Sequence, residues 1–411
     1  MIARRFGVLA VAALVTFACG GSSSGGTTTT TGDTITFGAP LGLTGSLTKE
    51  STLTQQGYDL WVDWINQQGG INIAGVKHPV KIKYYDDTSN ANQSAVLMQK
   101  LITEDKAQFL LGPYGSAATA TDAAIAEKNQ IPMVEANGAA QSIFNQGYKY
   151  TFGVLSPANK YLQGVIDMAA TLNPKPTKVA MLSADDNFSL EVADAINQYA
   201  PTKGLQVVLY KKYKNGSTNL VAEVQAAKAA SPDIVLNSGH LQEAIAINKA
   251  AKEQQLNAKI FAYSVGPSTP DFISALGKDA DYVYDGSQWT PQVKYKPAFY
   301  LTVQQYVDAY HKKYPGVGDP DYHVAESTAA CLAFQRAIES AKSTDPTKVR
   351  DALAKLDVTT FFGQIKFDNR GLNIYKPMVV EQIQSGAHHT VYPPDVADTQ
   401  AKYPTPSWAQ R

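Results

Sequence analysis

The sequence predicts an α/β protein built from two doubly wound lobes, and three observations lead to this prediction. Short apolar runs alternate with longer stretches of helical period, as expected for parallel strands that helices cover on both faces. This alternation runs to about Phe152 and begins again after Pro157, which indicates two similar lobes. The tail supplies helices first and then late strands, which suggests that the chain crosses between the lobes more than once.

The individual elements follow from these patterns. The expected strands share short apolar runs and cover residues 35–37, 80–85, 109–111, 131–134, 179–182, 206–210, 234–236 and 260–262. Helical spacing relates Tyr58, Trp61, Val62 and Ile65, and it places the two tryptophans 61 and 64 in a core. In the tail we expect helices at about 297–313, 322–341 and 346–356, followed by strands at 362–367 and 378–383.

The first nineteen residues predict export. Arg4 and Arg5 precede an apolar run over residues 6–18, then Cys19 and a tract rich in Ser, Gly and Thr. A basic start, a short apolar run and a small-residue exit are typical of a secretory signal, and the run is too short for a spanning helix. Residues 16–19 resemble the lipobox of bacterial lipoproteins, although Thr16 replaces the usual leucine. An ordinary signal peptide with an incidental cysteine is the alternative.

We therefore expect a signal peptide over residues 1–18, lipid on Cys19 and a flexible tether over residues 19–33. The protein would be extracytoplasmic, in the periplasm or at the cell surface, and attached to the membrane through lipid alone. Such a location argues against ATP-driven or nicotinamide chemistry.

Composition argues against several classes of function. The chain has 36 basic and 36 acidic residues, so no basic excess exists to bind nucleic acid or an anionic membrane. Apolar residues make up 44% of the chain, which is enough for substantial cores. Six scattered histidines and Cys331, which is expected to be buried, suggest neither a nucleophile with its base nor a metal cluster. We expect no enzyme activity, cofactor or metal.

Several short motifs occur in a fixed order between residue 35 and about residue 393. They are LTG at 43–45, GY at 57–58, NQQGGI at 66–71, YDD at 85–87, GPYGS at 112–116, GY at 147–148 and GQIKFD at 363–368, followed by Gly371. Together they resemble the receptors of branched-chain amino-acid ABC transporters, the Leu/Ile/Val-binding type of type I periplasmic binding proteins.

The resemblance implies two lobes that are joined by a three-strand hinge and close over a small ligand. It also implies a monomer that delivers this ligand to an ABC permease of the branched-chain amino-acid type. The crossings map near residue 152, residues 288–289 and residues 360–363. Lobe one would then hold residues 34–152 and 289–361, and lobe two residues 153–288 and 362–411.

The turn Tyr114-Gly115-Ser116 is the first candidate for ligand binding. It ends an apolar strand and opens a helix from 117 to about 128. Free N–H groups and the dipole at a helix start favour an anion such as a carboxylate. Gly115 would let the anion approach, and the Ser116 hydroxyl can donate to it. A serine here also suits a helix N-cap. The resemblance implies that Ser116 binds the ligand carboxylate.

The next strand-to-helix turn, Asn137-Gly138-Ala139, is the second candidate. In the family that the chain resembles, the position of Ala139 is commonly a threonine or serine. Only main chain from Gly138 and Ala139, together with the Asn137 amide, is available here. Glu135, which ends the preceding strand, is expected either at the cleft mouth or in the site.

Lobe two is expected to contribute Phe188, His240 and Val265. The resemblance places Phe188 where a tyrosine is frequent, His240 near a cleft aromatic, and Val265 where amino-acid receptors carry the acid that pairs with the ligand ammonium. A buried ammonium without a counter-charge is costly, so a non-amino organic or aromatic carboxylate is the alternative ligand. Glu50, in the first loop, would supply the missing charge or be a solvated carboxylate beside Lys49.

Trp289, at the second crossing, is expected to form an aromatic wall of the site or to pack in the hinge. In sum, the sequence predicts a tethered solute-binding lipoprotein for a small amino acid of branched-chain or apolar type. A sensing module for a signalling partner is a further alternative, and we would expect it to carry a spanning helix or a fused output domain. A hydrolase is another, and ester or glycoside turnover would reveal it.

Overall fold

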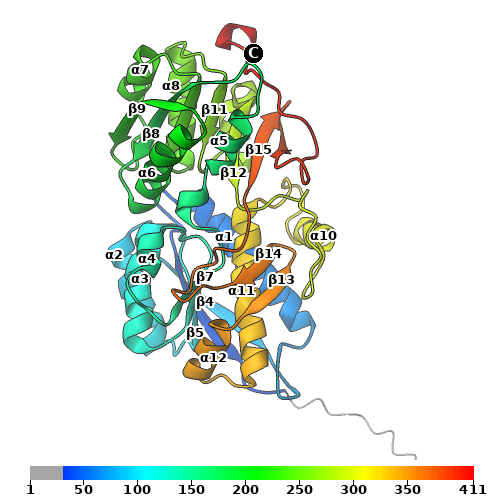
Figure 1. The fold of residues 1–411 in the computed structure, drawn as a ribbon. Coiled ribbons are helices and arrows are strands. Elements are labelled where there is room, and N and C mark those ends of the chain that lie inside the picture. Colours follow the sequence, from blue (N-terminus) through cyan, green and yellow to red (C-terminus); the bar gives the residue numbers. More distant parts are fainter. Residues whose placement is uncertain (1–30) are drawn as a thin grey trace, which may run out of the picture.

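The computed structural model describes residues 31–411 and contains two lobes, one above the other in Figure 1. We call the lobe around the five-stranded sheet, with strand order β4-β1-β5-β6-β7, the first lobe. The second lobe surrounds a seven-stranded sheet of order β16-β15-β12-β11-β10-β8-β9. The predicted α/β fold with two doubly wound lobes is thereby confirmed.

The first lobe forms because the inner strands of its sheet are buried and are covered by helices. All its neighbouring sheet strands are parallel. In chain order the elements are β1 (Ile35–Leu41), α1 (Thr48–Gln67), the hairpin β2 (Ile71–Ile73) and β3 (Val76–His78), β4 (Val80–Asp86), α2 (Ala91–Thr103), β5 (Phe109–Leu111), α3 (Ser116–Asn129), β6 (Met133–Glu135), α4 (Gln141–Phe144) and β7 (Thr151–Gly153).

The second lobe repeats this alternation and ends on an antiparallel edge. The elements are η1 (Ala158–Lys160), α5 (Gln163–Ala169), β8 (Lys178–Ala184), α6 (Asn187–Thr202), β9 (Gln206–Tyr213), α7 (Val221–Ala229), β10 (Ile234–Ser238), α8 (Leu241–Glu253), β11 (Ile260–Tyr263), α9 (Pro270–Leu276), η2 (Gly277–Ala280) and β12 (Val283–Ser287). The late strands β15 (Val379–Gln384) and β16 (Ala387–Tyr392) join this sheet antiparallel, beginning beside β12.

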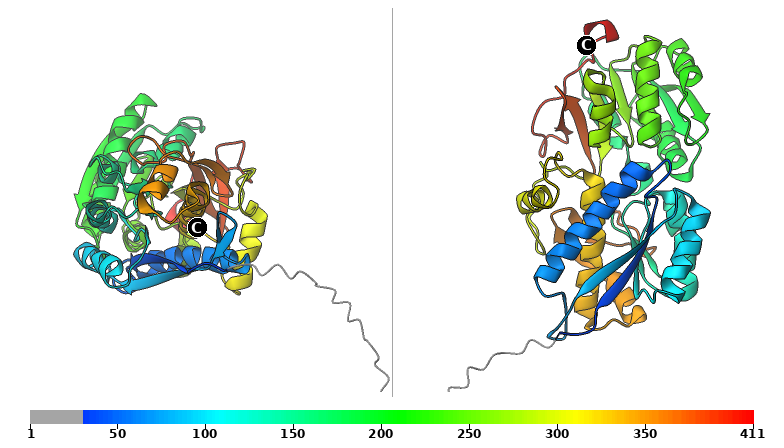
Figure 2. Two further views of the ribbon diagram at one scale, coloured as in Figure 1. Left: turned by 90° about the horizontal axis from the view of Figure 1, so that it is seen from below. Right: turned by 180° about the vertical axis from the view of Figure 1, so that it is seen from behind.

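Between β12 and β15 the chain returns to the first lobe. This segment contains α10 (Val303–Lys313), α11 (Tyr322–Ala341), α12 (Pro346–Leu353), β13 (Asp357–Thr360) and β14 (Gly363–Lys366). In the right-hand view of Figure 2, α1 crosses α11. The Trp61 indole N–H donates to Gln335 Oε1 at 3.1 Å and joins these two helices. The chain closes with η3 (Trp408–Gln410), where Trp408 packs against Phe261 of the second lobe.

The expectation that residues 362–411 belong to the second lobe is wrong for their first part. Phe362, Ile365 and Phe367 are buried in the core of the first lobe, and Leu372 pairs with Gly153 at the end of β7. The chain therefore passes to the second lobe between about residues 373 and 379, later than the expected 360–363. The apolar side chains on the β13–β14 hairpin explain the difference, because they extend the first lobe's core.

The three connections between the lobes lie side by side. Ser156, Gln288 and Lys376 come from one connection each and are joined by hydrogen bonds. Gln288 Nε2 donates to Ser156 O at 2.9 Å, and Ser156 Oγ donates to Lys376 O at 2.7 Å. The buried Lys376 ammonium donates to Gln288 O. These bonds join the three connections, and all three side chains are buried.

Residues 1–30 carry the expected signal peptide, Cys19 and most of the expected tether, and they lie outside the described residues. Within residues 31–411, no helix has both the length and the apolar character that crossing a membrane requires. Cys331 is buried in α11, as expected for a residue that fills a core.

Candidate ligand-binding site

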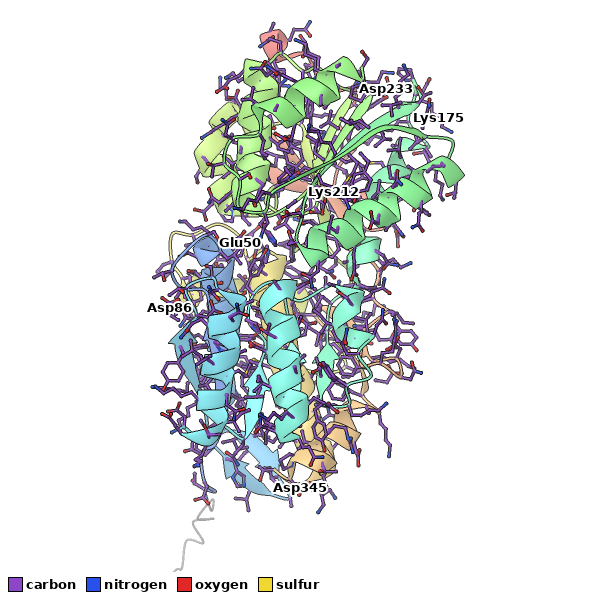
Figure 3. The ribbon with its side chains drawn as sticks, turned by 90° about the vertical axis from the view of Figure 1, so that its left-hand side faces the viewer. Glu50, Asp86, Lys175, Lys212, Asp233 and Asp345 are labelled. Atoms are coloured by element: carbon purple, nitrogen blue, oxygen red, sulfur yellow. The ribbon has the colours of Figure 1, made fainter. Side chains whose placement is uncertain are left out.

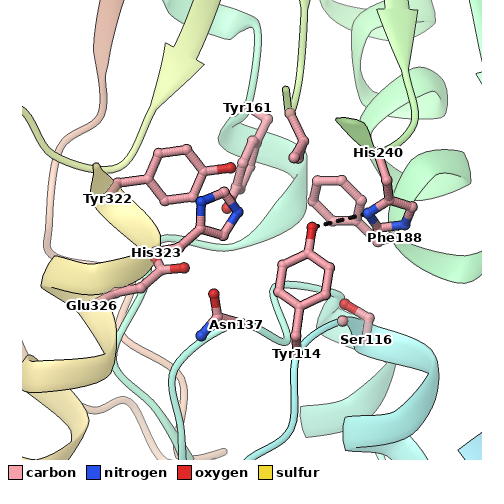
Figure 4. A pocket seen from close by; sticks show the side chains of 11 residues that line it. Tyr114, Ser116, Asn137, Tyr161, Phe188, His240, Tyr322, His323 and Glu326 are labelled. Carbon is pink, nitrogen blue, oxygen red and sulfur yellow. Dashed lines mark hydrogen bonds between the residues drawn. The ribbon is translucent and has the colours of Figure 1, made fainter. Parts of the chain in front are cut away.

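A cavity lies between the lobes, at the carboxyl ends of the parallel strands, where open α/β sheets usually bind ligands. It encloses about 260 Å³, part of it open to solvent. Figure 4 shows its wall, which is formed by Tyr114, Gly115, Ser116, Asn137, Tyr161, Phe188, His240, Val265, Tyr322, His323 and Glu326.

The start of α3 forms one side of this cavity. Gly115 is the N-cap residue and has φ +87°, a conformation that glycine adopts without strain. Ser116 is therefore the first residue of the helix rather than its cap, and its side chain is buried. The Ala140 N–H donates to Ser116 Oγ at 3.1 Å, which leaves the hydroxyl hydrogen free for a ligand. Free N–H groups of the first turn favour an anion here.

His240, which caps α8, brings a positive charge to the same side. Burial alone would lower the pKa of His240, but the negative charge of Asp186 raises this pKa to about 9. The His240 Nε2 atom lies 3.7 Å from Asp186 Oδ2, so the contact is an ion pair rather than a hydrogen bond. The other nitrogen, Nδ1, lies 3.0 Å from Tyr114 Oη. At neutral pH His240 is protonated, and Nδ1–H donates to Tyr114.

The opposite side of the cavity is formed by Asn137 and by the first turns of α11. Tyr322, His323 and Glu326 project from α11 toward the cavity in Figure 4. His323 Nδ1 is 2.7 Å from Asp321 Oδ2, and Asn137 Nδ2 donates to Ser327 Oγ at 3.2 Å. Burial raises the pKa of the Glu326 carboxyl well above its usual range, and the charge of Lys376 opposes this shift.

Sequence reasoning missed four of the wall residues, namely Tyr161, Tyr322, His323 and Glu326. The sequence did contain a signal for Glu326. It is the one charged residue between Val324 and Phe334, and the side chains of the helix are buried over that stretch. A carboxyl group in such a stretch is costly unless it has a partner.

Seven of the eleven predicted site residues line the cavity: Tyr114, Gly115, Ser116, Asn137, Phe188, His240 and Val265. Gly138 and Ala139 are not in the wall. The Gly138 N–H donates to the Glu135 carboxylate, and Ala139 O accepts from the Ala158 N–H at 2.8 Å. Glu135 is fully buried behind this turn, so the expectation that it lies at the cleft mouth or in the site is wrong.

Trp289 is also outside the cavity wall. Its indole N–H donates to Phe361 O at 2.9 Å, and its ring packs edge-on against Phe361 and Tyr306. It is 1% exposed within the core of the first lobe. Trp289 therefore packs near the hinge, as the alternative states. The expectation that it forms an aromatic wall of the site is wrong.

Glu50 lies in the first turn of α1 rather than in a loop, and it is buried at the boundary of the two lobes (Figure 3). Its Oε1 accepts a hydrogen bond from the Leu241 N–H of the second lobe at 3.1 Å. Next to it, Lys49 Nζ pairs with Asp271 of the second lobe at 2.8 Å. The expectation of a solvated loop carboxylate is wrong. Glu50 instead binds the second lobe through Leu241, and it lies outside the cavity wall.

The Glu50 contact gives a prediction about lobe closure. Glu50→Ala removes a charged acceptor from the Leu241 N–H, an interaction worth about 1.5–3 kcal/mol. We expect the ligand-free variant to open, with a larger radius of gyration in solution X-ray scattering than the unaltered protein. Glu253→Ala, at an exposed position of α8, is the control. Equal radii for the two variants would show that Glu50 does not hold the lobes together.

Within residues 31–411, no group of three or more His, Cys, Asp or Glu side chains is arranged to hold a metal ion. The cavity wall offers a ligand hydrogen bonds, charges and apolar contact. Phe188 and Tyr161 supply aromatic surface, with ring centroids 5.0 Å apart in an edge-to-face arrangement.

Comparisons with known proteins show the family of the chain and its fold. The family described as "Periplasmic binding protein" matches residues 34–388. A Leu/Ile/Val-binding protein homolog 7 from Brucella abortus is 24% identical over 411 residues, which cover 96% of this chain and 98% of the relative. Homolog 8 from the same organism is 24% identical over 382 residues, covering 90% and 93% of the two chains.

Solved structures share the fold at low identity. The branched-chain amino-acid transporter substrate-binding protein LivJ from Streptococcus pneumoniae, in complex with isoleucine, has a TM-score of 0.77 at 21% identity and covers 88% of this chain and 100% of its own. A solute-binding protein of an ABC transporter from R. palustris, in complex with benzoate, has a TM-score of 0.72 at 16% identity, covering 87% and 95%.

Proposed function

The chain belongs to the periplasmic binding protein family, and on this premise we propose that it is the extracytoplasmic receptor of an ABC importer. Its ligand is a small amino acid with an apolar, branched-chain type of side chain, held in the cavity between the lobes. The protein binds and releases this ligand without a covalent step. Relatives named for Leu, Ile and Val binding support this choice of ligand.

The observation that carries the proposal is the carboxylate-binding character of one side of the cavity. The Ser116 hydroxyl hydrogen and the first N–H groups of α3 offer donors there, and the protonated His240 adds a positive charge. Phe188 and Val265 supply apolar surface nearby, which suits an aliphatic side chain. Positive charge and helix N–H groups together favour a carboxylate over a neutral solute.

Lobe closure links binding to transport. Ser116 and Tyr114 belong to the first lobe, whereas Phe188, His240 and Val265 belong to the second. A ligand that contacts both sets stabilises the closed form, and the permease recognises that form. In this proposal residues 1–18 direct export, and lipid on Cys19 attaches the receptor to the membrane surface.

A second ligand class is a carboxylate without an amino group, such as an aromatic acid. Two observations favour it: Val265 lines the cavity where an acid would pair with an ammonium, and Tyr161 and Phe188 form an aromatic corner. The structural relative that holds benzoate supports this candidate as well.

The role of Ser116 is tested by Ser116→Ala. A hydrogen bond to a charged group contributes about 1.5–3 kcal/mol, so we expect ligand affinity to fall about 10- to 150-fold. Titration calorimetry of the purified protein with leucine, isoleucine and valine measures this change. Ser274→Ala, at an exposed position of α9, should leave affinity unchanged. Equal affinities for the two variants would exclude Ser116 as a carboxylate donor.

A further inference from the structure

We propose that Glu326, with Asn137 and His323, binds the ammonium group of an α-amino acid at the start of α11. The inference rests on the proposed function and deepens it, because it selects amino acids over carboxylates that lack an amino group. It also assigns a new position to the acid that Val265 does not provide.

Three buried polar atoms without partners point to this site. Glu326 Oε2, Asn137 Oδ1 and His323 Nε2 have no hydrogen-bond partner among residues 31–411. The three side chains are 1%, 7% and 1% exposed, and all line the same cavity. Buried polar groups are almost always paired, since leaving one unpaired is costly. A fourth atom of the cavity wall, Tyr322 Oη, is also unpaired among residues 31–411, and this gathering of unpaired polar atoms indicates that their partner is a ligand.

The bonds behind these atoms leave them able to accept hydrogen bonds from a ligand. Ser327 Oγ donates to His323 O at 2.6 Å, so its oxygen accepts from Asn137 Nδ2, and Asn137 Oδ1 is left as an acceptor. The 2.7 Å contact between His323 Nδ1 and Asp321 Oδ2 leaves Nε2 facing the cavity, and in the tautomer with its proton on Nδ1 this atom accepts. Glu326, when ionised, only accepts. An ammonium group has three N–H donors and matches three acceptors.

The charges around the cavity give the ligand a direction. Figure 4 shows Glu326, His323 and Asn137 on one side of the cavity, and Ser116 and His240 on the other. The protonated His240 repels an ammonium and attracts a carboxylate. At the other end, burial disfavours the charged form of Glu326, and a cation beside it would restore that charge. An amino-acid zwitterion satisfies both ends at once.

The assignment also determines which lobe binds the charged groups of the ligand before the lobes close. Ser116, Asn137 and Glu326 all belong to the first lobe, so this lobe alone can hold both charged groups of the ligand. The second lobe then adds His240 and the apolar surface of Phe188 and Val265 on closing. In a receptor with the acid at the position of Val265, the ammonium would instead be bound by the second lobe.

The test compares each branched-chain amino acid with its analogue that lacks the amino group. Titration calorimetry of the purified protein uses leucine with 4-methylpentanoate, isoleucine with 3-methylpentanoate, and valine with 3-methylbutanoate. For the unaltered protein we expect the best amino acid to bind more tightly than its analogue. In Glu326→Gln, amino-acid affinity should fall about 30-fold or more, while analogue affinity stays unchanged or rises.

Glu339→Gln, farther along α11 and outside the cavity wall, is the matched control and should bind like the unaltered protein. Unchanged amino-acid affinity in Glu326→Gln, or an equal loss for both ligands of a pair, would overturn the inference. Tighter binding of the analogues than of the amino acids by the unaltered protein would also overturn it, and would leave the receptor role standing. Binding of none of the six ligands would instead contradict the proposed function.

Discussion

Replacing His240 by glutamine is expected to weaken carboxylate binding by about 30-fold or more. The substitution removes a buried charge that faces the ligand and leaves Asp186 without its partner. Truncating one member of a buried charge pair typically costs about 2–5 kcal/mol. Titration calorimetry with 4-methylpentanoate measures the effect, because this ligand has no amino group that titrates.

The same residue predicts a pH dependence. The pKa of His240 is raised from 6.5 to about 9, so its charge is present below pH 9 and is lost above it. We expect carboxylate affinity to be steady near neutral pH and to fall above about pH 9, and this fall should be absent in His240→Gln. By linkage, the contribution of His240 to folding stability is complete below about pH 6.5 and fades as pH rises through about 9.

A matched histidine provides the control. His389 on β16 also pairs with an aspartate, since its Nδ1 lies 3.0 Å from Asp398 Oδ2, and it is outside the cavity wall. His389→Gln should leave ligand affinity and its pH profile unchanged. If the two histidine variants bound the ligand equally well, His240 would have no part in holding the carboxylate.

Trp61→Ala is expected to produce the largest loss of stability, about 3–5 kcal/mol. Trp61 is fully buried, packs edge-on against Phe37 with ring centroids 5.6 Å apart, and donates to Gln335 across the α1–α11 contact. Its removal leaves a cavity and an unpaired Gln335 oxygen. The midpoint and slope of urea unfolding, measured without ligand, report the change.

Trp64→Ala serves for comparison, because Trp64 is only partly buried and packs at the edge of the same core against Tyr300. Its loss should be clearly smaller than that of Trp61. A Trp61 variant as stable as the Trp64 variant would show that the α1–α11 contact contributes little. Since these helices carry Glu50 and Glu326, the contact also supports the position of both acids.

Much of the fold could be predicted because most strands and helices follow from local patterns of apolar residues. The strand at 109–111 and the helix at 322–341 have the predicted bounds. Six strands lie outside the expected ranges, namely β2, β3, β7, β12, β13 and β16, and two of them show the physical reasons. The strand β7 has only three residues, and β12 ends in Asp285, Gly286 and Ser287, polar or small residues that are buried through tertiary contacts.

The site was predictable only where it follows strand ends. Ser116 and Asn137 come directly after parallel strands, whose carboxyl ends meet at one edge of the sheet. Glu326 comes from a helix that reaches the cavity only because the chain returns to the first lobe. Such a placement depends on contacts between residues far apart in the sequence, and local patterns do not contain it. The same limit applies to Glu50, whose partner Leu241 lies in the other lobe.

The most direct test of the receptor role is a thermal-shift screen of the ligand-free protein against the twenty amino acids and simple organic acids, including benzoate. A ligand that binds only the folded protein raises its unfolding temperature. We predict that at least one apolar amino acid raises it clearly in the unaltered protein and fails to do so in His240→Gln. An unfolding temperature that no amino acid and no organic acid changes would contradict the proposal.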